Sequence, residues 1–389
     1  MEPTTAGLGD LPLDPKEECD IVMKGGITSG VVYPLAVVEL ARKYRLRSIG
    51  GTSAGAIAAG LTAAAELRRR KGSLAGFEEL ARLPEFLQKN LTSLFQPAPG
   101  TRSLFEVLLT LIDKEAAPGR KAPPGIAAKV ARILRTIMRF HALAFLGGTM
   151  QALFLFLLLV ALPAGSLRPW ALLVMLFFAL AGGLLGAILD WAVAGLLAVQ
   201  ANAFGLCPGI GGTKERPALT PWLTTTLDRI AGKQPGEGPL TFADLWGRGG
   251  AECRDIDLQV MTTNLTHGVP ERLPFKSSVY FYDSRELRRF FPEEIVDWMD
   301  RHPRASGRPR KRQDSEQDRL VIPADIRPLP SPADLPVVVA VRMSLSFPVL
   351  LSAIPLYAVE RIRDEPAKKW RARLSRCWFS DGGIGSNFP

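Results

Sequence analysis

The side chain best suited to covalent chemistry in this sequence is the hydroxyl of Ser53, in the segment Gly51-Thr52-Ser53-Ala54-Gly55. A Gly-x-Ser-x-Gly segment between a strand and a helix forms a tight turn that lifts the serine hydroxyl clear of the sheet. Gly51 and Gly55 are the positions where a Cβ would collide with neighbouring backbone. The positive end of the following helix also favours negative charge developing beside the serine. The pattern therefore predicts a nucleophile at Ser53.

A Gly-x-Ser-x-Gly string arises by chance on the order of 0.2 times in a chain of this length, so the string alone is weak evidence for a nucleophile. The residues on either side of Ser53 are therefore needed to support the prediction. Residues 45–49 form a short strand candidate, and residues 54–70 are rich in Ala, Leu, Glu and Arg with apolar positions at helical spacing. Strand, turn and helix thus follow one another in the order that a nucleophile turn requires.

A second glycine segment, Gly25-Gly26, separates a strand predicted at 20–24 from a helix predicted at 31–44. Backbone N–H groups in such a loop suit either a phosphate or an oxyanion. A phosphate loop would need a Gly-Lys-Ser/Thr or G-x-G-x-x-G series, and this segment has neither. We therefore expect Gly25 and Gly26 to donate to an oxyanion, with a plain tight turn as the alternative.

A serine needs a base within hydrogen-bond reach, and the sequence has only His141, His267 and His302 besides its carboxylates. No histidine follows Asp381, as the order Ser, acid, His of α/β-hydrolases would require. A strand that ends in Asp-Gly-Gly would place the Asp381 carboxylate at the carboxyl edge of a sheet. We expect Asp381 to act directly on Ser53 with a pKa raised by burial. A surface turn is the alternative for Asp381, and His267 is the next candidate base.

The elements around these residues predict an α/β protein. Strand, loop, helix, strand, turn and helix within residues 20–70 are the opening of an α/β sheet sandwich. The amphipathic helical pattern at 77–112, broken at Pro84 and Pro97, is interpreted as a cap or lid. Further strands are predicted at 256–263 and 278–282. Further helices are predicted at 221–232, at 241–246 with Thr241 as its cap, at 286–299, and as a short polar helix after Pro348.

Two uncharged runs, 142–167 and 170–189, are each long enough to cross a bilayer as a helix. The basic residues of 129–139 lie before the first run and only Arg168 lies between the two, so the positive-inside rule places the flanks in the cytoplasm. Ser53 and Asp381 lie on either side of this insert and must meet, which requires an even number of crossings. We expect a multi-pass membrane protein with two spans and a cytoplasmic catalytic domain. A buried helical hairpin in a soluble core is the alternative.

Composition limits the classes of molecule that the chain is expected to bind. A net charge of +10 over 389 residues favours nucleic acid or an anionic lipid surface. No recognition-helix or zinc-finger spacing supports nucleic acid, and the basic, Pro-rich stretch 302–332 is expected to be a solvated linker or an anionic-lipid contact. The four cysteines lack the spacing of a metal or disulfide site, and no calcium-ligand cluster is visible. No cofactor or metal is therefore expected, and no secretory signal is seen in residues 1–16.

Composition and motifs together predict a catalytic domain that is interrupted by an insert. The expected parts are a tail (1–19), a first catalytic part (20–140), a transmembrane insert (141–206), a second catalytic part (207–300), a basic linker (301–334) and a last catalytic part (335–389).

Four blocks together resemble the patatin-like phospholipases: Lys24 to Gly30, Gly51 to Gly55, Met343-Ser-Leu-Ser-Phe-Pro348, and Asp381-Gly-Gly-x-x-x-Asn-x-Pro389. The resemblance spans residues 20–389 outside the insert and linker. It implies a three-layer α/β/α sandwich with a mostly parallel central sheet. It also implies a Ser53–Asp381 dyad, an oxyanion hole at Gly25 and Gly26, and hydrolysis of acyl-ester lipids such as phospholipids through an acyl-enzyme.

The sequence departs from the family's common first block, Asp-Gly-Gly-Gly-x-Arg-Gly. Lys24 stands where the family has aspartate, Ile27 replaces the third glycine and Ser29 replaces the arginine. The family fold also continues into a helix after the last block, so we expect a truncated chain. Two alternatives remain open: an acyltransferase that uses the same dyad with an alcohol acceptor, and a catalytically silent patatin-like scaffold.

Overall fold

The structure is a computed structural model that divides the chain into two compact units. Unit 1 comprises Met1–Gln96 and Cys207–Pro389, and unit 2 comprises Pro97–Leu206. The residues that the structure describes are 11–26, 29–112, 125–158, 169–276, 279–304, 322–323, 325–364 and 369–387.

Unit 1 contains an eight-stranded mixed sheet. Its strands, in spatial order, are β1 (Glu17–Met23), β2 (Tyr44–Thr52), β4 (Asp257–Asn264), β10 (Lys369–Asp381), β9 (Ile354–Asp364), β6 (Tyr280–Asp283) and β7 (Ile326–Pro328), with β5 (Val269–Leu273) paired to β4. Only the pairings of β1 with β2 and of β2 with β4 are parallel, and the others are antiparallel. The protein is α/β as expected, but the prediction of a mostly parallel sheet is wrong.

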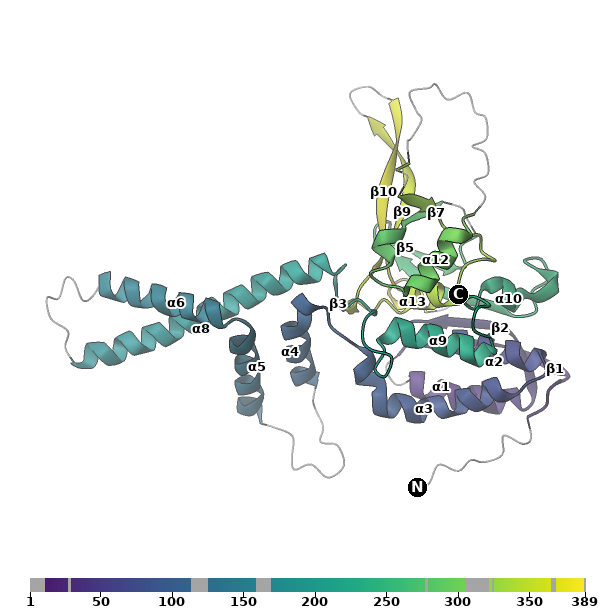
Figure 1. The fold of residues 1–389 in the computed structure, drawn as a ribbon, viewed down its shortest axis with the longest axis horizontal. Helices are drawn as coiled ribbons and strands as arrows, with labels where there is room; N and C mark the ends of the chain where they lie inside the picture. The colour runs from purple at the N-terminus through teal and green to yellow at the C-terminus, as the bar shows by residue number, and fades with distance from the viewer. Residues whose placement is uncertain are drawn as a thin grey trace. The chain divides into compact units, whose positions relative to one another are not determined.

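Two of the antiparallel strands come mainly from a segment that was predicted as a short polar helix. Residues after Pro348 instead form β9 and β10, which pair antiparallel along their length, from Ile354 opposite Phe379 to Asp364 opposite Lys369. Their alternating polar and apolar residues, as in Trp370-Arg-Ala-Arg-Leu374, have the period of two that a strand requires. Since the two strands are nearly consecutive in the chain, they pair antiparallel rather than through a crossover. Figure 1 shows them as a long ribbon.

The remaining elements of unit 1 are mostly helical. They are α1 (Ser29–Ala41), α2 (Ala54–Arg70), α3 (Ala75–Leu94), α9 (Leu219–Ala231), α10 (Phe242–Trp246), α11 (Ser284–Leu287), α12 (Glu293–Arg301) and α13 (Val337–Ser344), the short helices η4 (Gly247–Gly249) and η6 (Gly382–Ile384), and the strand β8 (Val349–Leu351). The expected start of α10 is confirmed, because the Thr241 side chain accepts from Asp244 N in a capping box.

Helix α2 is the centre of the helical layer. It packs against β2 and against α1, α3, α9 and α13, and Figure 1 shows α1, α2, α3 and α9 grouped beside β2. Ala56, Ala59 and Ala63 in this helix are fully buried, and these small side chains let the neighbouring elements approach closely. Helix α3 continues through Pro84 and packs against α1, α2 and α9. It is thus part of this layer.

The described residues of unit 2 are mostly helical. The helices are η2 (Pro99–Thr101), α4 (Arg102–Ile112), α5 (Ile126–Phe140), α6 (Ala142–Phe156) and α8 (Pro169–Ala201), followed by β3 (Gly205–Cys207), whose last residue belongs to unit 1. Helices α6 and α8 run antiparallel: His141 Nδ1 lies 2.8 Å from Asp190 Oδ2, and a Cβ added to Gly148 would lie 2.4 Å from the carbonyl oxygen of Gly182. Glycines therefore allow the two backbones to touch, as in packed membrane helices.

The expectation of two membrane-crossing helices is not met by the described residues. Helix α8 is the one helix among them that is long and apolar enough to cross a membrane, and its side chains are mostly exposed, unlike those of a helix buried in a soluble core. Helix α6 is apolar but ends at Phe156. The rest of the first expected span, from 159 onward, lies outside the described residues, as does most of the predicted basic linker.

Strand register places the ends of β2 and β10 at the same level of the sheet. Thr52 at the end of β2 is opposite Met261 of β4, and Asp381 at the end of β10 is opposite Thr262 on the other side of β4. Because neighbouring strands are about 4.8 Å apart, the two ends are separated by about 10 Å of backbone. Asp381 thus reaches the carboxyl edge of the parallel strands, but from an antiparallel strand.

A buried ion pair inside α2 gives the first test of this fold. The Glu66 carboxylate is fully buried and contacts the buried Arg69 guanidinium, which also donates to the carbonyl oxygens of Ala41 and Tyr44. Replacing Glu66 by Gln leaves a buried cation without its counter-charge, and we expect the free energy of unfolding to fall by about 3–5 kcal/mol. Chemical denaturation of the purified protein measures this loss.

The matched control is Glu85→Gln, in an exposed pair with Lys89 on α3. It should leave stability unchanged, because exposed pairs contribute little. Equal effects of the two substitutions would contradict the packing described for α2.

Candidate active site

Ser53 occupies a strained turn between β2 and α2. Its φ is +56°, in the left-handed region that residues with a Cβ rarely adopt. The two glycines are required by close contacts: a Cβ added to Gly51 would lie 2.4 Å from the carbonyl oxygen of Gly55, and one added to Gly55 would lie 2.0 Å from that of Met23. The turn therefore has the tight geometry that its sequence predicted.

The structure brings Ser53 and Asp381 together. Ser53 Oγ donates to Asp381 Oδ2 at 2.5 Å, although the two residues are 328 positions apart in the chain. The other carboxylate oxygen, Oδ1, accepts from Gly383 N at 2.6 Å, so the first turn of η6 fixes the orientation of the carboxylate. Asp381 is 3% exposed. A serine hydroxyl and a buried carboxylate in this contact can act as nucleophile and base.

Burial makes Asp381 a stronger base than an exposed aspartate. Desolvation raises the pKa of Asp381 above its ordinary value, against the lowering effect of the hydrogen bonds from Ser53 and Gly383. A carboxylate that binds a proton more tightly accepts one more readily from a neighbouring hydroxyl. The direction of the shift agrees with the sequence-based expectation.

The Gly25-Gly26 loop lies beside the serine. A Cβ added to Gly25 would be 2.6 Å from Ser53 Cβ and 3.3 Å from Ser53 Oγ, so only glycine allows the backbone to approach this closely. Gly26 follows it directly, and residues 27–28 of the loop lie outside the described residues. The first amides of α2, which begins at Ala54, also lack acceptors within their own helix. Both backbone segments are candidates to stabilise an oxyanion.

The last residue of α13 and the segment after it hold both members of the pair. Ser344 Oγ accepts from Ser53 N at 3.0 Å, and the carbonyl oxygen of Ser346 accepts from Asp381 N at 3.0 Å and from Ser380 Oγ at 2.6 Å. Sequence analysis did not assign these serines a role. The signal was present, because they belong to the block Met343 to Pro348 that carries part of the family resemblance.

A buried arginine anchors this segment. Arg342 is fully buried and donates to Ser346 Oγ at 2.7 Å and to the carbonyl oxygens of Pro208 and Ser352 at 3.0 and 3.1 Å. In the described part of the chain it has no carboxylate partner, and burial lowers its pKa to about 10. Arg342 therefore fixes, through Ser346, the backbone that positions Asp381.

The last sequence block, which begins at Asp381, contacts the turn that holds Ser53. Thr52 Oγ1 donates to the carbonyl oxygen of Asn387 at 3.1 Å, so the chain that leaves Asp381 returns to the residue before Ser53. Ile384, in η6, and Phe347, directly after Ser346, have large apolar side chains that are 51% and 53% exposed. Apolar surface is thus available on the segments that hold the pair.

The histidines have other partners. His267 lies between Asn264, 2.9 Å from Nδ1, and Glu360, 2.6 Å from Nε2. His141 contacts Asp190, and His302 contacts the carbonyl oxygen of Trp298. In the part of the chain that the structure describes, no histidine hydrogen-bonds to Ser53 or Asp381. His267 is therefore placed outside the pair.

One group of side chains could contribute ligands to a metal ion. Ligand atoms of His267, Glu360 and Cys377 lie within 4.8 Å of one another. However, Cys377 Sγ lies 3.9 Å from Nδ1 of His267, whereas Glu360 contacts Nε2. Because the imidazole ring separates the thiol from the carboxylate, the present arrangement is a hydrogen-bonded chain, and the ring would have to turn to bind one ion with both neighbours.

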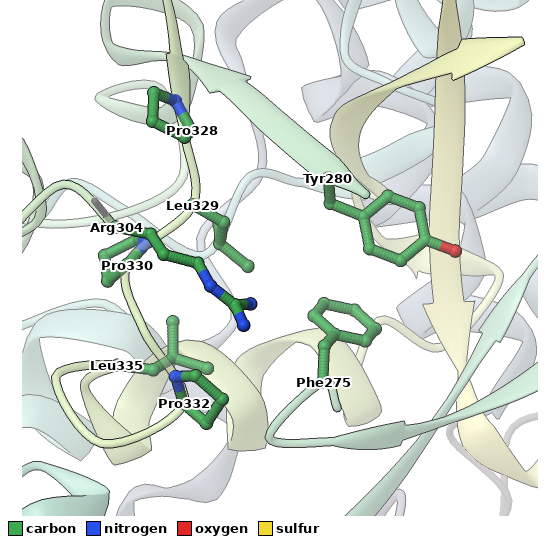
Figure 2. Close-up of a pocket in the computed structure, with 8 residues that line it drawn as sticks. All are labelled: Phe275, Tyr280, Arg304, Pro328, Leu329, Pro330, Pro332 and Leu335. Carbon is green, nitrogen blue, oxygen red and sulfur yellow. The ribbon is translucent and has the colours of Figure 1, made fainter. Parts of the chain in front are cut away.

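Unit 1 also has a small pocket away from these residues. It is lined by Phe275, Tyr280, Arg304, Pro328, Leu329, Pro330, Pro332 and Leu335. Figure 2 shows the Arg304 guanidinium pointing into this pocket toward the Phe275 side. None of the lining residues hydrogen-bonds to Ser53 or Asp381 in the described part of the chain, and the one hydroxyl among them, that of Tyr280, donates to Glu271 Oε1.

The sequence was compared with known families and proteins. No established family profile matches the sequence. The chain is similar to a protein named RpoH suppressor from Rhizobium meliloti (strain 1021), with 36% identity over an alignment 437 positions long. The alignment takes in 96% of this chain and 63% of the relative. Since unit 2 makes up more than a quarter of the chain, the aligned part includes most of unit 2 as well as unit 1.

The raised pKa of Asp381 predicts how its replacement affects stability. Above its folded-state pKa, Asp381 is a buried anion, which disfavours the native state relative to the unfolded chain. Asp381→Asn removes this charge and keeps an oxygen that can accept from Gly383. We expect its melting temperature to exceed that of the wild type at pH 7–8. The gain should shrink as the pH falls and the wild-type carboxyl becomes protonated.

Thermal unfolding at several pH values measures this difference. A melting temperature that falls in Asp381→Asn at neutral pH would show that the carboxylate stabilises the fold, contrary to its assignment as a desolvated base.

Proposed function

We propose that this protein is a membrane-associated serine hydrolase that cleaves acyl esters of phospholipids or related lipids, as a patatin-like enzyme with a Ser53–Asp381 dyad. The observation that carries the proposal is the direct hydrogen bond from Ser53 Oγ to Asp381 Oδ2 at a strained strand-to-helix turn. The four sequence blocks support it, because the described residues of all four lie around this bond. The family's three-layer sandwich is part of the same proposal.

The reaction follows from the contacts of the pair. Asp381 takes the proton of Ser53 as Ser53 Oγ attacks the ester carbonyl carbon, which forms a tetrahedral oxyanion. Backbone amides of the Gly25-Gly26 loop and of the start of α2 stabilise that oxyanion. The protonated Asp381 then gives its proton to the departing alcohol, leaving an acyl-Ser53 ester. Asp381 next removes a proton from water as the water oxygen attacks the acyl ester. It then gives this proton to Ser53 Oγ as the Oγ–acyl bond breaks, which releases the fatty acid and restores Ser53.

Two features of the chain favour a lipid as the ester. The exposed side chains of Phe347 and Ile384 lie on the segments that hold Asp381, and they offer an apolar surface for an acyl chain. Helix α8 has the length and composition of a membrane span. A tether to the membrane keeps the hydrolase near lipid substrate without any need for high aqueous solubility of that substrate.

Chain topology requires that any membrane crossing by α8 be matched by a second one. Within unit 2, Ala98 N and Thr101 Oγ1 both donate to the carbonyl oxygen of Leu206, so the chain leaves and re-enters unit 1 at one place. Ser53 precedes unit 2 and Asp381 follows it, yet the two are hydrogen-bonded. We propose that α6 takes part in the returning crossing and that unit 1 lies on the cytoplasmic side of the membrane.

Product analysis tests this function. The purified protein is incubated with mixed phospholipid vesicles, and the released lipids are identified by mass spectrometry. Wild type should release free fatty acid and lysophospholipid. Ser53→Ala should release none, and Asp381→Asn should lose at least two orders of magnitude in rate, because the general base typically contributes 10²–10⁴-fold.

His267→Asn is the matched control, since His267 contacts Glu360 and not the pair. It should keep most of the wild-type rate. Transfer of the acyl group to an added alcohol in place of water would identify an acyltransferase. A folded wild-type protein that consumes no lipid ester would favour the silent scaffold and contradict the proposal.

A further inference from the structure

Helix α5 in unit 2 has one cationic face and one apolar face. At 100° per residue, Arg132, Arg135 and Arg139 fall within a sector of about 60°, and α5 contains no acidic residue. Its isoleucines and its valine, Ile126, Val130, Ile133 and Ile137, fall on the opposite side of the helix. Such a division between arginines and branched apolar residues is typical of helices that lie in a membrane interface.

Packing within unit 2 leaves much of both faces of α5 uncovered. The arginines of the cationic face are exposed. On the apolar face, Ile137 is buried near the end of the helix, but Ile126 is 83% exposed and Val130 is 48% exposed. The apolar face is therefore buried near the C-terminal end of α5 and exposed near its N-terminal end. The exposed part is apolar surface that the interior of a membrane could cover.

The end of α5 coincides with a boundary between polar and apolar parts of unit 2. His141, directly after α5, contacts Asp190 of α8. Beyond this pair, α6 and the first 21 residues of α8, Pro169 to Leu189, contain no charged residue. Helix α8 is about 50 Å long at 1.5 Å per residue, more than the bilayer's hydrocarbon core of about 30 Å. The His141–Asp190 pair thus fits the level at which the apolar core of a bilayer ends.

We propose that α5 lies along the membrane surface at this level and that its arginines bind the headgroups of anionic phospholipids. The cationic face meets the phosphates, while Ile126 and Val130 enter the boundary between headgroups and acyl chains. Each arginine presents a planar fork of donors that fits a phosphate. This inference rests on the membrane association proposed above and is independent of ester hydrolysis.

Nucleic acid is the other anionic macromolecule that an arginine face could bind. The geometry favours lipid, because a duplex would neutralise the arginines but leave Ile126 and Val130 in water. The helix is also followed within two residues by the apolar α6. A membrane surface satisfies both faces of α5 at once.

Hydrogen exchange on the full chain tests this proposal. Ser53→Ala protein, which cannot consume the lipid, is reconstituted into nanodiscs of phosphatidylcholine alone or of phosphatidylcholine with phosphatidylglycerol. Exchange of the α5 amides, followed by mass spectrometry of its peptides, should slow several-fold when phosphatidylglycerol is present. Added salt should reverse part of the effect, because it screens the charges. The double substitution Arg135→Glu/Arg139→Glu should abolish the difference between the two nanodiscs.

The matched control is Lys214→Glu/Arg248→Glu, which makes the same change of net charge at two exposed residues of unit 1. It should leave the lipid-dependent slowing of α5 intact. Exchange of α8 reports membrane insertion separately. Protection of α8 with equal exchange of α5 in both nanodiscs would overturn the proposal for α5 while leaving membrane association standing. Rapid exchange of the α8 amides in both nanodiscs would overturn the proposal for α5 and the proposed membrane association. Slower exchange of the α5 amides with duplex DNA but not with phosphatidylglycerol would assign the cationic face to nucleic acid.

Discussion

The contact between Ser53 and Asp381 depends on the order of three strands. Ser53 follows β2, Asp381 ends β10, and β4 lies between them with Met261 and Thr262 setting their level. Two side chains must then bridge about 10 Å of backbone. The strained turn at Ser53 and the η6 turn after Asp381 aim the hydroxyl and the carboxylate at each other over β4. A shift of one residue in either register would turn these side chains to opposite faces of the sheet.

Much of the surrounding structure serves this contact. Ser344 fixes the backbone of Ser53, Ser346 fixes that of Asp381, and the buried Arg342 holds the segment that carries both serines. The same contact constrains unit 2, because the chain must leave unit 1 and return to it between the two residues. The long apolar helix α8 therefore belongs to a segment whose two ends both join unit 1. The cationic helix α5 lies in this segment, where its sequence changes from polar to apolar.

Local patterns in the sequence were sufficient to predict the turn at Ser53 and helix α2. The bounds of α2 at Ala54 and Arg70 were predicted from residue composition and spacing. The contact of Asp381 with Ser53 followed from excluding histidine and from the family blocks. The end of β10 at Asp381 was predicted as a strand, but β9 and the first part of β10 were missed because a charged segment with alternating apolar residues was interpreted as a polar helix. The block Met343 to Pro348 marked the segment that contains Ser344, but it did not show what the segment contacts. Ser344 accepts from Ser53, 291 positions away, and Arg342 donates to Pro208, 134 positions away, as well as to the nearby Ser346. No local pattern encodes the two distant contacts.

The central claim is that Asp381 alone activates Ser53, with no imidazole between them. Its most direct test is the rate at which a fluorophosphonate probe modifies Ser53 as a function of pH. The account predicts that the rate falls as acid protonates a single carboxyl group whose pKa is raised by burial, that His267→Asn leaves this profile unchanged, and that Asp381→Asn removes the reaction. A profile that moves when His267 is replaced, or rapid modification of Ser53 in the Asp381→Asn protein, would contradict it.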